Sequence, residues 1–513
     1  MAAPMQEHVK SEKWITESGV FCRNDYGNTP LEKSKLYNPK LLIFRELILA
    51  TVSELSRTKE TPLYAVDTSS GSGLAGMQWK KQLKSQVHVT ITDSSPHNCV
   101  KHNCSKNDLQ VATLTPDLCR PPGLPLESQD DNTLHVCRAL PLAVLQMEAF
   151  DFVYLDPRKN PTSYFDPVFA NTKNNGVVSL VVPNVSGFAR TPHIVLRNYG
   201  ANVIKTDYSK EMAARIVTAC MARSAASCSK GIQVLFCASF DDFLLVTVRV
   251  LRGPVHADAS VGLVRQLIHC QICEERQFYP DQKSPLEDPY SLLPCDCHVT
   301  SPGRTAVVLG PMWCGGIFDT DFLTKMTQQT ESLKISVKTK SLLSSLIEES
   351  VCYLPKEEQC VNLSSVLTVE DSKSLRDSGT ENDSSQEDLN IIKSPKVNSE
   401  SRKREYVSEC DTQTKKMKSV KDDEEKDSSK GRSLSNSISK GRQSDMCPPF
   451  YCSTLQRKNY RDITVPKLDR MVTLLRSSGF RASRTHFDAV AMRTDANLKQ
   501  IYGVLKQHCS KQK

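Results

Sequence analysis

Apolar and polar positions between about residues 60 and 255 follow two alternating patterns. The strand-like runs are rich in Val, Ile and Leu, and they read "PLYAVDTSS", "VHVTITD", "FDFVYLDP", "GVVSLVVPN", "IQVLFCASF" and "FLLVTVRVL". Helical segments lie between several of them, such as "SKEMAARIVTACMARSAASC", in which Met212, Ile216, Ala219 and Cys220 share one face. Continuous apolar strands that alternate with helices predict a buried, mostly parallel sheet, to which the last two runs add a hairpin. We therefore expect an α/β domain over residues 15–255.

The rest of the chain divides into an ordered part and an insert. Residues 256–330 form a second predicted unit, in which four cysteines are closely spaced. Between residues 331 and 446, stretches such as "DSGTENDSSQEDLN" bury too little apolar area to offset the entropy of ordering, so most of this insert is expected to be disordered. Residues 447–508 are predicted to be ordered again and to complete the second unit. Their pattern "VPKLDRMVTLLRSSGF" predicts a helix that ends at Gly479.

Composition narrows the class of protein only a little. The chain has 513 residues, and its net charge of +8 suits a polyanionic partner, although many enzymes share such a charge. We find no apolar leader and no run of 18 apolar residues, so neither a secretory signal nor a membrane span is expected. In a reducing compartment the 19 cysteines are then expected to be metal ligands or small hydrophobic residues.

The stretch "VDTSSGSGLAG" leads from the first strand into a helix. Gly71, Gly73 and Gly76 have the spacing of a dinucleotide-binding turn, which lets backbone amides approach a ligand. Asp67, which ends that strand, Gly71 and Gly73 are therefore candidate cofactor-binding residues. Asp93 ends the second strand, 22 residues after Gly71, where an acid can accept hydrogen bonds from ribose hydroxyls. The alternatives are a turn that only connects two elements and an aspartate that caps a turn. The same layout serves NAD and S-adenosylmethionine.

A later strand ends in Asp156-Pro157, which favours S-adenosylmethionine. A carboxylate at this position can accept an N–H hydrogen bond from an exocyclic amine and offset charge as the nitrogen attacks a sulfonium methyl group. A nicotinamide enzyme is disfavoured because no residues for hydride chemistry follow the glycine turn. The alternative role of Asp156 is to cap a turn or helix. Arg158 and Lys159 follow directly and can stack on a base or pair with phosphate, or they form a solvated turn.

Two close cysteine pairs indicate a structural zinc site. Cys270 and Cys273 are separated by two residues, Cys295 and Cys297 by one, and the pairs by 21 residues. Four thiolates in two pairs are typical of a closed tetrahedral zinc site, whose metal contributes to folding. The adjacent His298 could replace one ligand. The alternative is four incidental cysteines in a cysteine-rich chain.

Several segments together resemble the tRNA guanine N2,N2-dimethyltransferase family. They are "YNPKLLIFREL", "VDTSSGSGLAGMQWKKQL", "ITDSSPHNCVKHNCSKN", "FDFVYLDP", "RNYGANVIKTDYSKEMAARIV", "KGIQVLFCASFDDFLLVTVRVLRG", "LGPMWCGGIFDTDFL" and "PPFYC…SRTHFDAVAMRTDAN". The resemblance spans about residues 15–505. Because of the segment "CQICEER", the chain most resembles the animal dimethyltransferase-like paralogue of this family. It implies a Rossmann-like S-adenosylmethionine-dependent methyltransferase domain followed by a smaller α+β domain with a zinc site. It also implies methylation of the N2 amine of a tRNA guanosine.

The resemblance implies roles for four residues. Arg45 matches an arginine that contacts the methionine carboxylate of the cofactor, and Asp93 matches the acid that binds its ribose. Ala139 matches the second residue of an Asp-Ala pair beside the adenine. Asp156 matches the catalytic acid.

The chain also departs from the family pattern. Ala75 replaces a cofactor-binding arginine, and Arg138 replaces the acid of the Asp-Ala pair. Arg158 and Lys159 replace the aromatic residue and the glycine that follow the catalytic Asp-Pro. A second hypothesis therefore stays open, in which the chain is a weakly active or inactive tRNA-binding paralogue.

Contacts with RNA and a cellular location are expected from the basic residues. The target guanine is expected to be turned out of its stack into the pocket at Asp156. Basic residues near the C-terminus are predicted to bind tRNA phosphates, or else to form a charged solvated surface; they are Arg481, Arg484, His486 and Arg493.

Two basic clusters in the insert, Lys403-Arg404 and Lys415–Lys418, resemble a two-part nuclear-import signal, or else a solvated charge run. We expect a monomer that binds tRNA and an import receptor and that resides in the nucleus, with the nucleolus and the cytoplasm as alternatives.

Overall fold

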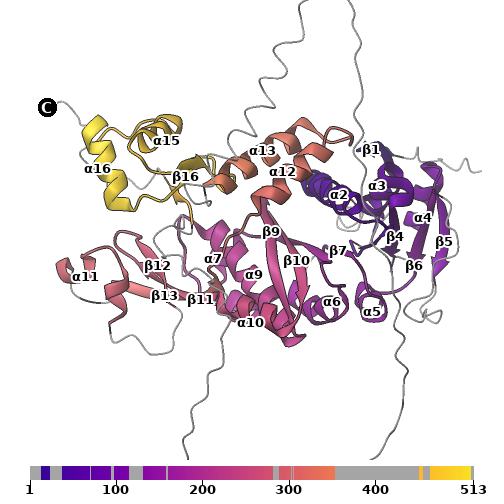
Figure 1. Cartoon of the computed structure of the whole chain (residues 1–513), viewed down its shortest axis with the longest axis horizontal. Helices are drawn as coiled ribbons and strands as arrows, with labels where there is room; N and C mark the ends of the chain where they lie inside the picture. Colours follow the sequence, from indigo (N-terminus) through magenta and orange to yellow (C-terminus); the bar gives the residue numbers. More distant parts are fainter. Residues whose placement is uncertain are drawn as a thin grey trace, which may run out of the picture. The chain divides into compact units, whose positions relative to one another are not determined.

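An eight-stranded sheet forms the centre of the α/β domain (Figure 1). The structure, a computed structural model, describes residues 13–23, 37–69, 71–93, 98–114, 131–157, 160–280, 288–301, 303, 305–352, 450–453 and 463–509. In spatial order the strands of the sheet are β5 (Gln110–Leu114), β6 (Thr133–Cys137), β4 (Val87–Thr92), β3 (Leu63–Asp67), β7 (Phe152–Leu155), β8 (Val177–Pro183), β10 (Phe243–Arg252) and β9 (Lys230–Phe240).

The sheet is mostly parallel, as the sequence predicts. The strands from β5 to β8 pair in parallel, while β10 is antiparallel to both β8 and β9. The six predicted strands are confirmed as β3, β4, β7, β8, β9 and β10, and the last two form the predicted hairpin. The edge strand β5 and its neighbour β6 were not predicted, because "QVATL" and "TLHVC" lack a long β-branched run.

Side chains alternate between two cores along the buried strands. Phe152 and Tyr154 of β7 belong to the core on one face of the sheet, and Val153 and Leu155 belong to the core on the other. Helices cover both faces, as expected for parallel strands whose two faces are apolar. The helices of the first core are α2 (Leu42–Arg57), α3 (Leu74–Leu83) and α4 (Cys99–Lys106). The helices on the other face are α5 (Pro141–Met147), α6 (Phe165–Asn171), α7 (Gly187–Arg190), α8 (Pro192–Tyr199) and α9 (Ser209–Ser227).

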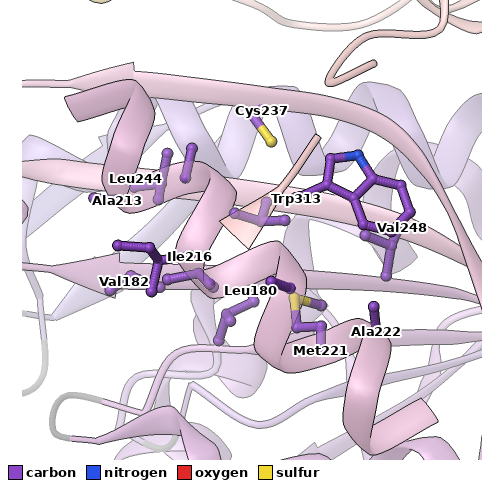
Figure 2. Packing of buried hydrophobic residues seen from close by; sticks show 14 of the residues in the cluster. Leu180, Val182, Ala213, Ile216, Met221, Ala222, Cys237, Leu244, Val248 and Trp313 are labelled. Atoms are coloured by element: carbon purple, nitrogen blue, oxygen red, sulfur yellow. The ribbon is translucent and has the colours of Figure 1, made fainter. Parts of the chain in front are cut away.

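The long helix α9 lies against the strands in the centre of the second core (Figure 2). Its predicted extent is confirmed, and Met212, Ile216 and Ala219 are each at most 1% exposed. Figure 2 shows Ala213, Ile216 and neighbouring side chains of α9 packed over Leu180 of β8. Small alanines on this helix allow it to approach the sheet closely, while each larger apolar side chain contributes about 1.5–3 kcal/mol when it is buried.

Two smaller sheets follow in the chain. The first has the order β12 (Arg276–Phe278), β11 (Val264–Cys270) and β13 (Ala306–Trp313), and it follows α10 (Pro254–Gly262). The second has the order β14 (Cys452–Ser453), β16 (Ala491–Thr494) and β15 (Ala482–Arg484). The helices near these sheets are α11 (Cys297–Thr300), α15 (Leu468–Ser477) and α16 (Leu498–Cys509). The helix α15 confirms the amphipathic pattern, and Gly479 follows it with a positive φ of 85°.

The second of two helices after the first small sheet lies beyond residue 331 and so corrects the predicted start of the disordered insert. The helices α12 (Thr320–Gln329) and α13 (Val337–Val351) pack together and against α2 of the large domain. Leu343 and Leu346 of α13 are fully buried, so the ordered chain extends at least to residue 352. The abundance of serine in this segment hid its apolar spacing from the sequence analysis. The rest of the predicted disordered insert lies outside the described residues.

A short hairpin precedes the large domain. It consists of β1 (Trp14–Glu17) and β2 (Val20–Arg23), and it contacts α3 and α4. Single 3-10 turns occur at Pro39–Leu41, Lys84–Gln86, Pro161–Tyr164 and Pro289–Leu292. Within the described residues, every helix is too short or too polar to span a bilayer.

Candidate active site

Four predicted site positions lie at one edge of the large sheet. The strands β6, β4, β3 and β7 are parallel neighbours, so their carboxyl ends meet at the same edge. Asp67 ends β3, Asp93 follows β4, Ala139 lies just beyond β6, and Asp156 follows β7. Residues separated by up to 89 positions in the sequence are thus placed at one edge by the topology.

The Asp67 carboxylate accepts hydrogen bonds from two backbone N–H groups of the glycine turn. Its Oδ1 accepts the Ser69 backbone N–H at 2.9 Å, and its Oδ2 accepts the Gly76 backbone N–H at 2.9 Å. The side chain is fully buried, and this burial raises the pKa of the carboxyl group. Both carboxylate oxygens therefore bind the protein backbone. The predicted cofactor residue Asp67 acts here by fixing the shape of the turn.

The glycines of the turn meet distinct local requirements. Gly73 has a φ of 68° at the N-terminus of α3, in the left-handed region that glycine adopts without strain. A Cβ atom on Gly76 would lie only 2.7 Å from Cγ1 of Ile91, so glycine is needed for α3 to pack against β4. Gly71 is buried in the same turn. Glycine at these positions therefore gives the turn its shape and brings α3 close to the sheet.

Asp93 is paired with Arg138, the residue that departs from the family pattern. The Arg138 Nη1 atom lies 3.3 Å from Asp93 Oδ2 and donates to Asn98 Oδ1 at 2.7 Å. Asp93 is 1% exposed, and its backbone N–H binds the Cys137 carbonyl at 2.9 Å. Ala139, the other residue after β6, is 9% exposed. One oxygen of the carboxylate that was predicted to bind ribose is thus already paired with the Arg138 guanidinium.

Arg45 forms a bidentate ion pair that the sequence analysis missed. Its Nε and Nη2 atoms donate to the two carboxylate oxygens of Glu17, each at 2.6 Å. Nη1 and Nη2 also donate to the Asn38 carbonyl, at 3.2 and 3.1 Å. Gln78 donates to Glu17 Oε1 at 3.0 Å, which completes this buried group. In this structure the predicted partner of the cofactor carboxylate is therefore engaged by a protein carboxylate.

Asp156 lies half-buried beside the glycine turn. The Thr68 hydroxyl and backbone N–H both bind the Tyr154 carbonyl, at 2.7 and 3.1 Å, which fixes the end of β7 against the end of β3. The pKa of Tyr154 lies well above its ordinary value, because the phenol is buried and because the Asp156 and Asp67 carboxylates are near it. Asp156 is thus a partly accessible carboxylate at the predicted place. Arg158 and Lys159, which follow it, lie outside the described residues.

The four predicted cysteine ligands form one cluster. Cys270 ends β11, Cys273 lies in the next turn, and Cys295 and Cys297 lie at the start of α11. Their Sγ atoms all lie within 4.8 Å of one another, so the group could hold a metal ion. A tetrahedron with metal–sulfur bonds of about 2.3 Å has edges of about 3.8 Å, which fits this donor set. His298 instead stacks on the Tyr290 ring with 5.4 Å between ring centres.

Two predicted RNA contacts are wrong because their side chains are buried. Arg493 is fully buried, and its Nη2 atom lies 2.8 Å from Glu211 Oε2 and 2.7 Å from Glu349 Oε1. The His486 side chain is 1% exposed, and its Nδ1 lies 2.6 Å from Glu349 Oε2. Arg215 also pairs with Glu211, at 2.9 Å. Phosphates cannot reach these buried groups. Their ion pairs instead connect α9, α13 and the last small sheet.

The other two predicted RNA contacts are also paired within the protein. Arg481 is 8% exposed and lies 3.0 Å from Asp495, so its burial likewise contradicts the predicted contact. Arg484 is exposed, and its Nε donates to Asp469 Oδ1 at 2.8 Å. Of the four predicted C-terminal contacts, Arg484 alone presents its cation to solvent. The import clusters Lys403-Arg404 and Lys415–Lys418 lie outside the described residues.

Comparisons with known proteins agree on one family. The family model described as N2,N2-dimethylguanosine tRNA methyltransferase matches residues 21–377 and 403–506. A human tRNA (guanine(27)-N(2))-dimethyltransferase is 33% identical over an alignment of 493 residues that covers 93% of this chain. The chain spans 61% of the length of that human relative. These relatives are named as methyltransferases, which gives no support to the hypothesis of an inactive paralogue.

More distant relatives are archaeal. A tRNA (guanine(26)-N(2))-dimethyltransferase of Methanosphaera stadtmanae is 25% identical over 335 residues, which cover 64% of this chain and 77% of that protein. The solved structure of Trm1 from Pyrococcus horikoshii in complex with S-adenosyl-L-methionine has a TM-score of 0.62 at 17% identity, covering 97% of this chain and all of that one. At this identity the similarity establishes the fold, a methyltransferase-like α/β sheet.

Proposed function

The chain belongs to the N2,N2-dimethylguanosine tRNA methyltransferase family, and on that premise we propose that it transfers a methyl group from S-adenosylmethionine to the N2 amine of a guanosine in tRNA. The observation that carries the proposal is the position of Asp156. This half-buried carboxylate follows β7 and lies beside the glycine turn that follows β3. A nucleophile held by Asp156 would therefore lie beside the cofactor turn.

The residues of the sheet edge suit S-adenosylmethionine. The glycine turn offers backbone N–H groups at the start of α3, and Asp93 offers a carboxylate for the ribose hydroxyls. Arg45 offers a guanidinium, once its pair with Glu17 is exchanged for the cofactor carboxylate. When bound, the cofactor supplies an electrophilic sulfonium methyl group. The Pyrococcus horikoshii relative with this fold is in complex with the same cofactor.

The contribution of Asp156 is to bind and orient the guanine amine. The lone pair of that amine is delocalised into the base, so the nitrogen is a weak nucleophile. A carboxylate that accepts one of its N–H hydrogens increases electron density on nitrogen and stabilises the positive charge that develops there. Placing nitrogen, methyl carbon and sulfur in line supplies the remaining rate enhancement through proximity. The base must leave its stack to reach the site, at a cost of a few kcal/mol.

The remaining assignments concern structure and location. We propose that the four-cysteine cluster binds one structural Zn²⁺ ion, because all four positions are filled by protein thiolates and none is left for a substrate. We further propose that the protein binds tRNA as a monomer. The basic clusters of the insert support uptake into the nucleus by an import receptor.

The test of the proposed reaction is methyl transfer followed by nucleoside mass spectrometry. Purified protein is incubated with labelled S-adenosylmethionine and unmodified tRNA, and the product nucleosides are separated. Appearance of N2-methylated guanosine supports the proposal. Label on another base or another atom, or binding of NAD without S-adenosylmethionine, would refute it.

A further inference from the structure

The N-terminal hairpin has one buried and one solvent-facing side. Glu17, Val20 and Cys22 point inward and are at most 3% exposed. Phe21 points outward and is 40% exposed, and Trp14 on the paired strand is partly exposed. The inward residues already pack the hairpin onto the core. The two outward aromatic side chains are therefore not needed for that packing.

Lysine side chains of α3 and α4 lie over the outward rings. The Lys106 Nζ atom is 5.7 Å from the centre of the Trp14 ring and 5.9 Å from that of Phe21, and Lys81 Nζ is 6.0 Å from Phe21. The His102 ring stacks on Trp14 with centres 5.5 Å apart. At these distances each ammonium group is weakly attracted to the face of the ring, so the lysines and the aromatic rings form one surface.

We call this surface the hairpin–α4 face. Its members are Trp14, Phe21, Lys81, His102 and Lys106, and Lys101 is a further exposed lysine on the same helix α4. Its charge is positive, because Glu17 of the hairpin is buried against Arg45, and Asp108 is the one acid within residues 98–110. Basic side chains interleaved with aromatic rings are typical of surfaces that bind nucleic acid.

Two asparagines of the α4 region hold the hairpin, and one of them also bonds the cofactor turn. Asn103 of α4 accepts the Arg23 backbone N–H at 3.0 Å and donates to the Ser72 carbonyl in the glycine turn at 3.0 Å. Asn107, one turn later, accepts the Phe21 backbone N–H at 2.8 Å and donates to its carbonyl at 2.7 Å. A ligand bound on the hairpin–α4 face would therefore be held in a defined position relative to the glycine turn.

We propose that the hairpin–α4 face binds the phosphate backbone of the tRNA substrate next to the cofactor turn. The proposal rests on the proposed function for the identity of the RNA. Phosphate contacts set the register of a nucleic acid on a protein, so this face would help to place the target guanosine at Asp156. It supplies the exposed cations that the buried C-terminal residues His486 and Arg493 do not.

The first experiment measures tRNA affinity against salt concentration. The double substitution Lys101→Gln with Lys106→Gln removes two exposed cations, and Lys338→Gln with Lys340→Gln on α13 removes two others as a matched control. Loss of two phosphate contacts is expected to reduce the slope of log K against log salt by about 1.4–1.8 and to weaken binding by roughly tenfold at low salt. The control should behave as wild type. Equal affinities and slopes in both variants would overturn the proposal.

The second experiment uses Trp14 as a reporter. The chain has three tryptophans, and the other two, Trp79 and Trp313, are 0% and 3% exposed. Bound tRNA should therefore change the emission of Trp14, and Trp14→Phe should remove that signal while tRNA is still bound. A full signal in Trp14→Phe would place the RNA elsewhere.

Failure of this proposal differs from failure of the proposed reaction. If wild-type protein methylates tRNA but the lysine pair can be removed without effect, the reaction stands and the assignment of the face is wrong. If the lysine pair is needed for tRNA binding but no methyl group is transferred, the face is supported and the reaction is wrong. Selective loss of binding to vesicles of anionic lipid, with tRNA binding intact, would also overturn the assignment.

Discussion

The Nη1 atom of Arg138 lies 3.3 Å from Oδ2 of Asp93, and this ion pair joins the carboxyl ends of two neighbouring strands, β6 and β4. Asp93 is almost fully buried, whereas the Arg138 side chain is 37% exposed. Asp93, the acid expected to bind ribose, is thus already paired with Arg138. A bound cofactor must therefore compete with Arg138 for the Asp93 carboxylate.

Replacement of Arg138 by Ala is therefore expected to strengthen cofactor binding. Partly exposed ion pairs of this kind contribute about 0.2–1 kcal/mol, so the affinity for S-adenosylhomocysteine should rise by roughly threefold in calorimetric titration. Arg197→Ala, at an exposed position of α8, is the matched control and should leave the affinity unchanged. Weaker binding by Arg138→Ala would mean that the arginine supports the site instead of competing for it.

The buried cluster around Arg493 makes a second prediction, on stability. Glu349→Gln removes a carboxylate that binds both Arg493 and His486, and breaking a fully buried pair costs about 3–5 kcal/mol. The adjacent Glu348 is about half-exposed and pairs with Arg476 at the surface, so Glu348→Gln should cost about 0.5 kcal/mol or less. Chemical denaturation of the two variants measures the difference. Similar losses from both would contradict the role given to the cluster.

The same cluster predicts acid sensitivity. Burial by itself raises the pKa of Glu349, but the charges of Arg493 and His486 outweigh it and hold that pKa at about 2, below its ordinary value of 4.5. Because the folded pKa is depressed, the stabilisation is complete above about pH 4.5 and is lost as the pH falls towards about 2. The free energy of unfolding should therefore fall with acid in this range. In Glu349→Gln the fall should be smaller, and an unchanged pH profile would refute the assignment.

The cysteine cluster gives a fourth prediction. Cys273→Ser should abolish binding of about one equivalent of zinc and lower the melting temperature, because the metal contributes folding free energy. Cys228→Ser, at a partly buried cysteine outside the cluster, should retain the metal. Zinc content is read by elemental analysis of the purified variants. Full zinc content in Cys273→Ser would exclude this residue as a ligand.

The sequence was informative where local pattern decides structure. Apolar runs rich in Val, Ile and Leu predicted six strands, and the strand that ends in Asp156-Pro157 placed the candidate catalytic carboxylate at the sheet edge. Close spacing also predicted the cysteine cluster, since each pair lies within a single turn or at one helix end.

The sequence did not predict which charged side chains are buried, because that depends on residues far apart in the chain. Charged side chains are usually exposed, so Arg493 was interpreted as a surface residue. Its burial depends on Glu211 and Glu349, which lie 282 and 144 positions away in the chain. The Arg45–Glu17 pair, 28 positions apart, was missed for the same reason. No local periodicity encodes such pairs, because they form only when separate elements pack together.

Asp156→Asn provides the most direct test of the central claim. The isosteric amide keeps the shape of the side chain but cannot offset the charge that develops on the guanine amine. Initial rates of methyl transfer to tRNA should fall by about 10²–10⁴-fold, while the affinities for tRNA and S-adenosylhomocysteine stay close to those of the wild type. Asp166→Asn, at an exposed position of α6, should keep the full rate. A wild-type rate in Asp156→Asn, or a loss of tRNA binding as large as the loss of rate, would contradict the account.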